Sequence, residues 1–354
     1  ELVDVLERTV RITEIAEDRI PYYKRLGAIW EVKLERDRES LDAWNEVLQI
    51  DSRDLDALRA TAALYRKLQQ PDDLVETLHR LIEAGQLQNM SVEEIREAYA
   101  ELGKLYSDSL MRPNDAIDSW RKVFEYNKKD FRALAALEKL FGEEARWEDA
   151  VDVIEKRIKL LDSPADKISE LIKAAKIWED SVSDAAAAAD AYERVLQIDK
   201  HNLTASQALE NIYRARGSWS QLSELLLARV EFPNFTPHQR IEAYQAIARI
   251  YEDNMSDRES AFVVLQAAFR EDYSVDSTAR ELERLASITG KWGDLLGEYT
   301  QSVQQLADLK ARADLWVKIG RWYNEHLGRV DYAIASQQQA LALDPNHKEA
   351  LQNL

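Results

Sequence analysis

The sequence of 354 residues predicts an all-α protein built from stacked helix pairs. Aromatic anchors recur along the whole chain at intervals of 76, 72, 73 and 72 residues: Trp30, Tyr106, Trp178, Tyr251 and Tyr323. Apolar residues around an anchor follow helical spacing, as in Tyr99, Leu102 and Tyr106, and strand-like alternation is nowhere sustained. Only 10 glycines and 7 prolines occur, so few residues interrupt the helices.

Helix starts recur with the same period as the anchors. Ser91 and Thr236 each stand three residues before Glu or Gln, a pattern typical of helix N-caps. Ser163 and Asp308 hold the same place, so the four starts fall 72, 73 and 72 residues apart. Each interval has room for four helices of about 12 to 16 residues. We expect four units, 19–90, 91–162, 163–235 and 236–307, preceded by the end of another unit at 1–18 and followed by a truncated fifth at 308–354.

Each unit divides into two halves, because a second set of anchors stands 35 residues after the first four. The basic module is therefore a helix pair of about 35 residues. Small residues such as Ala116 stand ten residues after the main anchors, where two helices are expected to approach closely. The second anchors are Tyr65, Phe141, Tyr213 and Ala286, and the second-half helices are expected to begin at Trp147, Trp219 and Trp292, for which local packing is favoured over ligand binding.

This pattern resembles that of the tetratricopeptide repeat family. The clearest copy carries Trp316, Ile319-Gly320, Tyr323, Ala333 and Pro345 at the family's positions. The resemblance implies one continuous right-handed superhelix over residues 1–354, a solenoid of about nine to ten helix pairs. It also implies that partners bind in a concave groove lined by the first helix of each pair. The family's two-carboxylate clamp is not reproduced, so we do not expect the chain to bind the acidic C-terminal peptide of a chaperone.

Both ends of the sequence fall inside the repeat. Residues 3–7 match residues 151–155, which belong to the last helix of a unit, and Leu354 lies in a third helix. An end repeat normally carries a polar cap, and neither end has one. We therefore expect a larger parent chain or complex.

Composition and motifs favour an interaction protein over other classes. With 65 Asp and Glu against 47 Lys and Arg, the net charge of −18 argues against nucleic-acid partners. No cysteine occurs, no two of the five histidines lie within helical reach, and no phosphate-binding glycine loop is present. We therefore expect no catalytic residues, no metal site, no cofactor and no enzymatic activity. We also expect no membrane insertion and a cytoplasmic location, with a periplasmic or secreted one left open.

A basic column supplies the candidate partner site. The position two residues before each anchor is mostly basic from the second unit onward, and in the resembling family this position faces the concave groove. Such a stripe would attract an acidic or extended partner segment. The column consists of Lys104, Lys139, Lys176, Asn211, Arg249, Arg284 and Arg321, and Arg59, Lys173, Arg280 and Lys318 occupy neighbouring groove positions.

The alternative interpretation is that these cations pair with carboxylates on their own helices. Asp108 stands four residues after Lys104, and Lys176, Arg249 and Arg321 also have acidic residues three or four positions on. Such pairs stabilise a helix by about 0.2 to 0.5 kcal/mol each. Lys139 and Arg284 are expected to lack such a partner. A protein-binding scaffold is the leading hypothesis, with a self-assembling structural rod, an enzyme and an RNA-binding helical repeat as alternatives.

Overall fold

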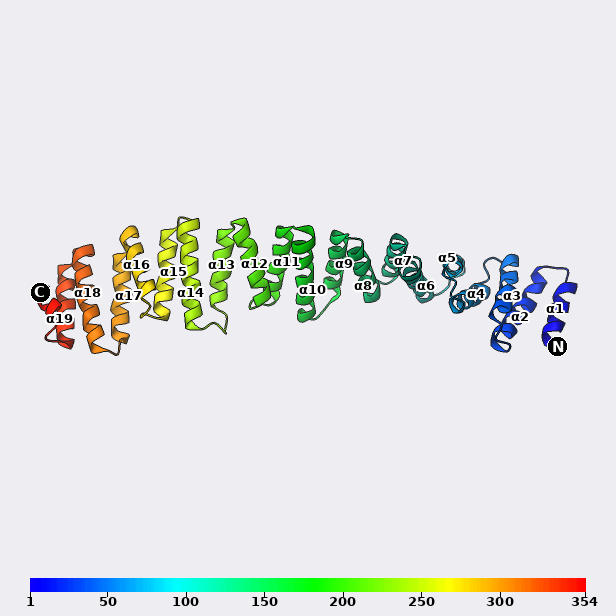
Figure 1. Cartoon of the computed structure of the whole chain (residues 1–354), viewed down its shortest axis with the longest axis horizontal. Helices are drawn as coiled ribbons and strands as arrows, with labels where there is room; N and C mark the ends of the chain where they lie inside the picture. The colour runs from blue at the N-terminus through cyan, green and yellow to red at the C-terminus, as the bar shows by residue number, and fades with distance from the viewer. The chain divides into compact units, whose positions relative to one another are not determined.

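A computed structural model describes residues 1–354, and it contains twenty α-helices and no β-strand (Figure 1). Every helix contact of substance joins elements that are neighbours, or near neighbours, along the chain. The helices form two compact units, residues 1–184 and 185–354. The prediction of an all-α stack of helix pairs is confirmed.

The first unit contains ten α-helices. In each pair the first helix packs against the second, and the second against the first helix of the next pair. The helices are α1 (Leu2–Ile12), α2 (Ile20–Val32), α3 (Asp37–Ile50), α4 (Leu55–Lys67), α5 (Pro71–Leu87), α6 (Val92–Lys104), α7 (Pro113–Tyr126), α8 (Phe131–Glu143), α9 (Trp147–Leu160) and α10 (Pro164–Lys176), with a 3₁₀ turn at Glu17–Arg19 and π-helical turns at Leu105–Ser109 and Ile177–Val182.

The second unit contains the other ten α-helices and continues the alternation of first and second helices. Its last helix is short, with five residues. The helices are α11 (Ala185–Ile198), α12 (Leu203–Arg216), α13 (Trp219–Val230), α14 (Pro237–Arg249), α15 (Arg258–Glu271), α16 (Asp276–Thr289), α17 (Trp292–Gln305), α18 (Leu309–Leu327), α19 (Val330–Leu343) and α20 (Lys348–Gln352), with a π-helical turn at Ile250–Asn254.

The predicted helix starts are confirmed by their caps. Ser91, Ser163, Thr236 and Asp308 each accept a hydrogen bond from a backbone amide two or three residues on. The full capping box forms only at Thr236, where the Gln239 side chain accepts from the Thr236 amide at 2.9 Å. At Ser91 it does not form, because Glu94 accepts instead from Arg59 Nε at 2.6 Å.

The main anchors end their helices through one repeated hydrogen bond. The carbonyl of each anchor accepts from the backbone amide six residues on, at 2.8 to 2.9 Å. Between the two residues the chain enters the left-handed region, as helices commonly do where they end. The left-handed residue is Glu35, Met111, Ser183, Ser256 or Gly328, always five residues after the anchor.

The second anchors close a shorter turn. Their carbonyls accept from the amide five residues on, at 2.8 to 3.1 Å, and the next helix begins one residue sooner. Leu74 stands nine residues after its anchor and Ala116 ten residues after its own. Because of the shorter turn, each is nevertheless the fourth residue of its helix. Both side chains are buried. The turn inside the second halves is thus one residue shorter than the turn inside the first halves.

Close approach of paired helices requires glycine where the partner is a tryptophan. A Cβ added to Gly27 or Gly103 would lie 2.5 Å from Trp44 Nε1 or 2.6 Å from Trp120 Nε1. Trp44 and Trp120 are buried in the core of the first unit, as predicted. Ala248 holds the equivalent place in the second unit, opposite the smaller Leu265.

The second-half tryptophans begin their helices as predicted. Trp147 and Trp219 are half-buried, whereas Trp292 is 7% exposed and stacks on the His326 ring with centroids 3.7 Å apart. Trp292 therefore serves local packing.

Candidate partner-binding surface

The eleven candidate residues all lie on first helices, and ten are exposed while Lys318 is half-buried. Five belong to the first unit: Arg59, Lys104, Lys139, Lys173 and Lys176. Six belong to the second unit: Asn211, Arg249, Arg280, Arg284, Lys318 and Arg321.

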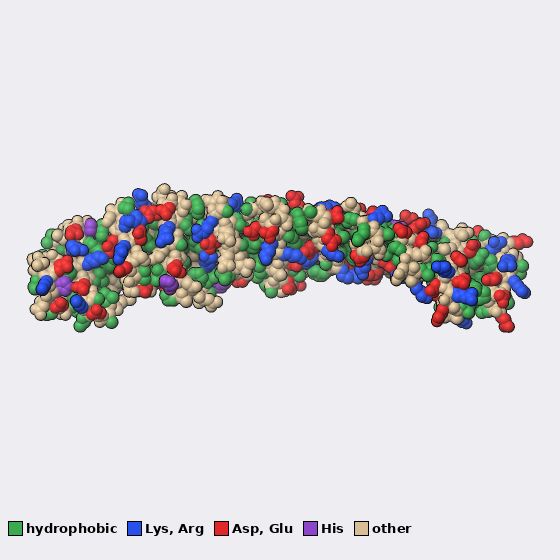
Figure 2. All heavy atoms as spheres, in the orientation of Figure 1, with side chains coloured by type: hydrophobic (Ala, Val, Ile, Leu, Met, Phe, Trp, Pro, Cys, Tyr) green, Lys and Arg blue, Asp and Glu red, His purple; other side chains and the backbone are tan.

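Carboxylates of the neighbouring first helix neutralise many of these cations. Arg59 Nε lies 2.6 Å from Glu94, and Lys173 pairs with Glu138. In the second unit Arg284 pairs with Glu252, and Arg321 lies 3.6 Å from Glu349. We call these contacts, with Lys318–Glu283, the inter-pair ladder. On the face shown in Figure 2, positive and negative side chains are accordingly interspersed and not gathered by sign.

Lys318 is the least exposed cation of the ladder. Its Nζ lies 2.6 Å from Glu283 Oε1 and 4.3 Å from the centroid of the Trp322 ring. The Tyr299 hydroxyl donates to the same carboxylate oxygen at 2.9 Å. Burial, reinforced by the charge of Glu283, raises the pKa of Tyr299. Lys318 is therefore a structural residue that joins α18 to α16.

The expected absence of partners for Lys139 and Arg284 is wrong. Lys139 Nζ lies 3.6 Å from Glu143, four residues on in the same helix. Arg284 Nε lies 2.8 Å from Glu281, and its two terminal nitrogens both contact Glu252. Arg280 also has a partner on its own helix, Asp276, at 3.5 Å.

The cations expected to pair within their helices do not do so. Lys104, Lys176 and Arg249 are exposed and form no ion pair. Each is the last residue of its α-helix, directly before a π-helical turn. A π-turn holds an extra residue, so the carboxylate four positions on no longer stands beside the cation. Arg321, in a helix without a π-turn, contacts Glu349 in α20 and not Glu325.

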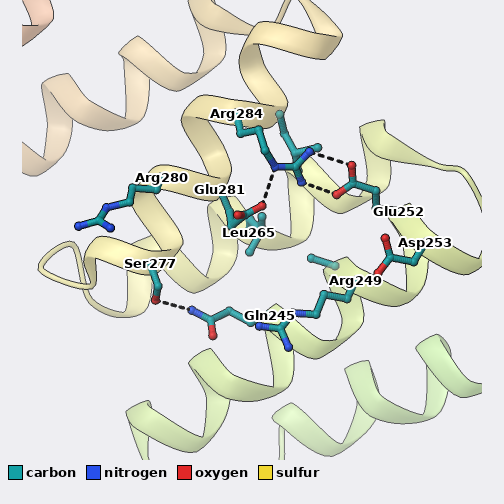
Figure 3. A pocket seen from close by; sticks show the side chains of 11 residues that line it. Gln245, Arg249, Glu252, Asp253, Leu265, Ser277, Arg280, Glu281 and Arg284 are labelled. Carbon is teal, nitrogen blue, oxygen red and sulfur yellow. Dashed lines mark hydrogen bonds and ion pairs between the residues drawn. The ribbon is translucent and has the colours of Figure 1, made fainter.

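Arg249 lies at a pocket of about 550 Å³ between α14 and α16, shown in Figure 3. Gln245 Nε2 donates to Ser277 Oγ at 3.2 Å across this pocket, and Leu265 of α15 contributes to its lining. Arg284 holds Glu252 and Glu281 at one side, whereas Arg280 extends away from the other labelled side chains. Arg249 is thus the cation of this pocket that no carboxylate neutralises.

The electrostatics of the pocket follow from the Arg284 pairs. Hydrogen bonds from Arg284 lower the pKa of the Glu252 carboxyl below its usual value of 4.5, with a further contribution from Arg258. The contact with Glu252 in turn raises the pKa of the Arg284 guanidinium. Both groups therefore stay charged near neutral pH. The Glu252 carboxylate forms its ion pairs with Arg284 and Arg258 and none with Arg249.

Sequence reasoning missed the acceptors of the ladder. Glu94, Glu138 and Glu283 stand 35 residues from Arg59, Lys173 and Lys318 respectively, which is the length of one helix pair. Opposite charges at this spacing were the available signal. Asn211, the one uncharged member of the column, is exposed on α12 and its side chain forms no hydrogen bond within the chain.

One segment of the chain matches a known family in sequence. Residues 313–347, which lie in α18, α19 and the turn after them, match the family model described as tetratricopeptide repeat. The turn that joins these two helices recurs at every main anchor. The chain thus contains a tetratricopeptide repeat, in residues 313–347. No curated protein matches it in sequence.

Solved structures resemble this chain in fold alone. The MamA protein is 18% identical with a TM-score of 0.33, covering 52% of this chain and 94% of its own. The structure of Naa15/Naa10 bound to HypK-THB is 14% identical with a TM-score of 0.41, covering 100% of this chain and 60% of that one. The TPR2AB domain of yeast Sti1, solved in a pHSP90 complex, is 19% identical with a TM-score of 0.30, covering 76% of this chain and 97% of that one.

Neither a metal-binding group of side chains nor a membrane-spanning helix is found along the chain. No group of three or more His, Asp or Glu side chains is arranged to hold a metal ion. None of its helices combines the length and the apolar character that crossing a membrane requires.

Proposed function

We propose that the chain is a non-catalytic scaffold whose first helices hold an acidic or extended segment of a partner protein. The carboxylates of that segment would bind Lys104 and Lys176 in the first unit and Arg249 in the second. The single observation that carries the proposal is that these three cations stay unpaired at the same repeat position in a chain of net charge −18.

The distinction between paired and unpaired cations decides which residues bind. A partner carboxylate that approached Arg59 or Arg284 would have to displace Glu94 or Glu252, which already form close ion pairs. At Lys104, Lys176 and Arg249 it would displace only water. The energetic gain per exposed pair is small, so the three sites together would orient and select a partner more than bind it tightly.

We propose further that the segments 19–90, 91–162, 163–235 and 236–307 are the repeating units of this scaffold, in one continuous solenoid. The recurrence of cap, π-turn and unpaired cation at intervals of 72 and 73 residues supports this division. Each such unit from the second to the fourth would present one carboxylate-binding position on its first helix.

The test uses the whole chain and a labelled peptide of alternating Glu and Gly. We expect K104E/K176E/R249E to weaken binding, measured by fluorescence anisotropy, by about tenfold or more, which corresponds to about 1.4 kcal/mol. The matched control is K129E/K200E/K310E, which makes the same change in charge at exposed lysines outside the column. Equal binding by the two triple variants would contradict the proposal, and added salt should weaken the specific binding.

A further inference from the structure

A second concave surface lies on the second helices of the second unit, and it shares no lining residue with the pocket of Figure 3. It is a groove of about 560 Å³ between α13 and α15. Tyr244 of α14 and Tyr251 of the following π-turn line it, and Lys291 stands at the start of α17. The remaining lining residues are Leu227, Glu259, Ser260, Val263, Val264 and Ala267.

The groove is apolar at positions that are polar in most other repeats. Val263 is the sixth residue of α15, and the sixth residues of α3, α7, α11 and α19 are Asp42, Asp118, Asp190 and Ala335. At the tenth residue Ala267 replaces the polar residues Glu46, Lys122, Arg194 and Gln339. At the ninth residue of the second-half helices, Leu227 stands where α5, α9 and α17 have His79, Glu155 and Thr300.

Leu227 also cannot form the hydrogen bond that the residue at its position forms in the first unit. In the first unit His79 Nε2 lies 2.8 Å from the hydroxyl of the anchor Tyr106. Leu227 has no polar group to offer to Tyr251, the equivalent anchor. The Tyr251 hydroxyl makes no hydrogen bond within the chain and remains able to bind one from outside.

Val263 does not belong to the core of its own unit, whereas Val264 beside it is buried. Phe262, Leu265 and Phe269 supply the buried face of α15 and are 0%, 3% and 1% exposed. Val263 is 55% exposed in the middle of the same helix. An exposed apolar surface rimmed by polar residues is typical of an interaction site.

The shape and charge of the groove indicate what fills it. Ser260, Val263, Val264 and Ala267 have the spacing i, i+3, i+4 and i+7, and their side chains are short, so a second helix can approach α15 closely. At the rim Glu259 is 75% exposed, whereas its partner Lys291, 3.1 Å away, is only 26% exposed. The accessible charge at this end is therefore negative, and it complements a basic residue.

We propose that this groove binds one amphipathic α-helix of a partner protein. Large apolar side chains of that helix, at the same spacing, enter between α13 and α15, and a basic residue meets Glu259. This is a second docking surface, independent of Lys104, Lys176 and Arg249, so the scaffold holds two kinds of segment at once: acidic or extended on its first helices and helical on its second helices.

The experiment selects binders from a displayed library of amphipathic helical peptides, using the whole chain as bait. The variant L227H/V263D restores the residues found at equivalent positions in the first unit and should fold. We expect selected peptides to carry apolar residues at i, i+3 or i+4, and i+7, and to lose at least about tenfold in affinity for this variant. The matched control I288D places a charge at another half-exposed apolar residue of the second unit, outside the groove, and should retain binding.

A reverse experiment grafts the groove onto the first unit. In H79L/D118V we expect the same peptides to bind two sites per chain instead of one. The proposal fails if no peptide is enriched, or if enriched peptides bind L227H/V263D as well as the parent. It also fails if light scattering shows that V263D merely abolishes self-association, which would make a second copy the occupant, or if only small apolar dyes bind the groove. K104E/K176E/R249E should not affect these peptides, so the two docking surfaces are tested separately.

Discussion

Single residues with positive φ mark the end of every first helix that carries a main anchor. Only Gly328 is a glycine, whereas Glu35, Met111, Ser183 and Ser256 hold the left-handed conformation with a side chain. For a non-glycine residue this conformation costs about 1 to 2 kcal/mol. The hydrogen bond that closes each turn compensates for the strain, so the turn is set by its amides more than by its residue type.

Met111 offers the clearest test, because its side chain is 78% exposed and packs little. We expect Met111→Gly to increase the free energy of unfolding by about 0.5 to 1 kcal/mol, since relief of strain exceeds the extra backbone entropy of glycine. The measurement is the thermal unfolding midpoint by circular dichroism. Gly328→Ala is the reciprocal control and should lower the midpoint; a decrease for Met111→Gly would contradict this account.

Gly103 is required for a different reason, the contact with Trp120. We expect Gly103→Ala to destabilise the first unit by about 1 to 3 kcal/mol, because the new Cβ would lie 2.6 Å from Trp120 Nε1. Trp120→Leu reproduces the pair Ala248 and Leu265 of the second unit, so in its presence the alanine should be nearly neutral. A double-mutant cycle in chemical denaturation measures this coupling. Additive effects would show that the clash is relieved elsewhere.

At the scale of the helices, the inter-pair ladder makes stability depend on pH, and the contact of Arg132 in α8 with Glu97 in α6, at 2.7 Å, belongs to it as well. Hydrogen bonds from Arg132 and Arg284 lower the folded-state pKa of Glu97 and Glu252 below the usual 4.5. The unfolded chain therefore binds these protons more readily than the folded chain. The stabilisation is complete above about pH 4.5 and is lost as the pH falls through the lowered folded-state values.

We expect the melting temperature to fall steeply on acidification below about pH 4.5, and to fall less steeply in Glu97→Gln/Glu252→Gln, which is already weaker at neutral pH. Glu144→Gln is the control, since Glu144 is exposed and forms no ion pair. Melting curves recorded from neutral pH downward would test this. Identical slopes for the parent and the double variant would exclude the ladder as the cause.

How far the sequence predicts each element depends on the range of the interactions that form it. Helix starts such as Ser91 and Thr236 were predictable, because a cap bonds to amides three residues away. The π-turns were not, because the extra residue leaves no mark in the apolar spacing. The pairing of Arg284 with Glu252 was missed because the two residues lie 32 positions apart, and only the stacking of α14 beside α16 brings them together.

At the scale of the whole chain, stability comes from contacts between neighbours. Helices make their substantial contacts with elements that precede or follow them closely in sequence. In such proteins stability is roughly a sum over repeats and their interfaces, and local contacts favour fast folding.

Each compact unit should therefore fold without the other. We expect the fragment 1–184 to be helical and to unfold cooperatively, because it contains its own core around Leu58, Leu102, Ile117 and Leu134. Circular dichroism at increasing urea concentration is the measurement. The variant Leu102→Asp in the same fragment should abolish the transition, and a parent fragment without any transition would contradict the expectation.

Turns closed by a hydrogen bond over six residues alternate with turns closed over five residues, and this alternation has an evolutionary consequence. Recombination that inserts or removes a whole unit of 72 or 73 residues joins each helix to the same kind of connection that it had before. A gain of one helix pair alone would place two connections of the same length in succession. Every later helix would then turn a different face toward its neighbour. Lineages of this protein should therefore lengthen or shorten by duplicating and deleting double modules.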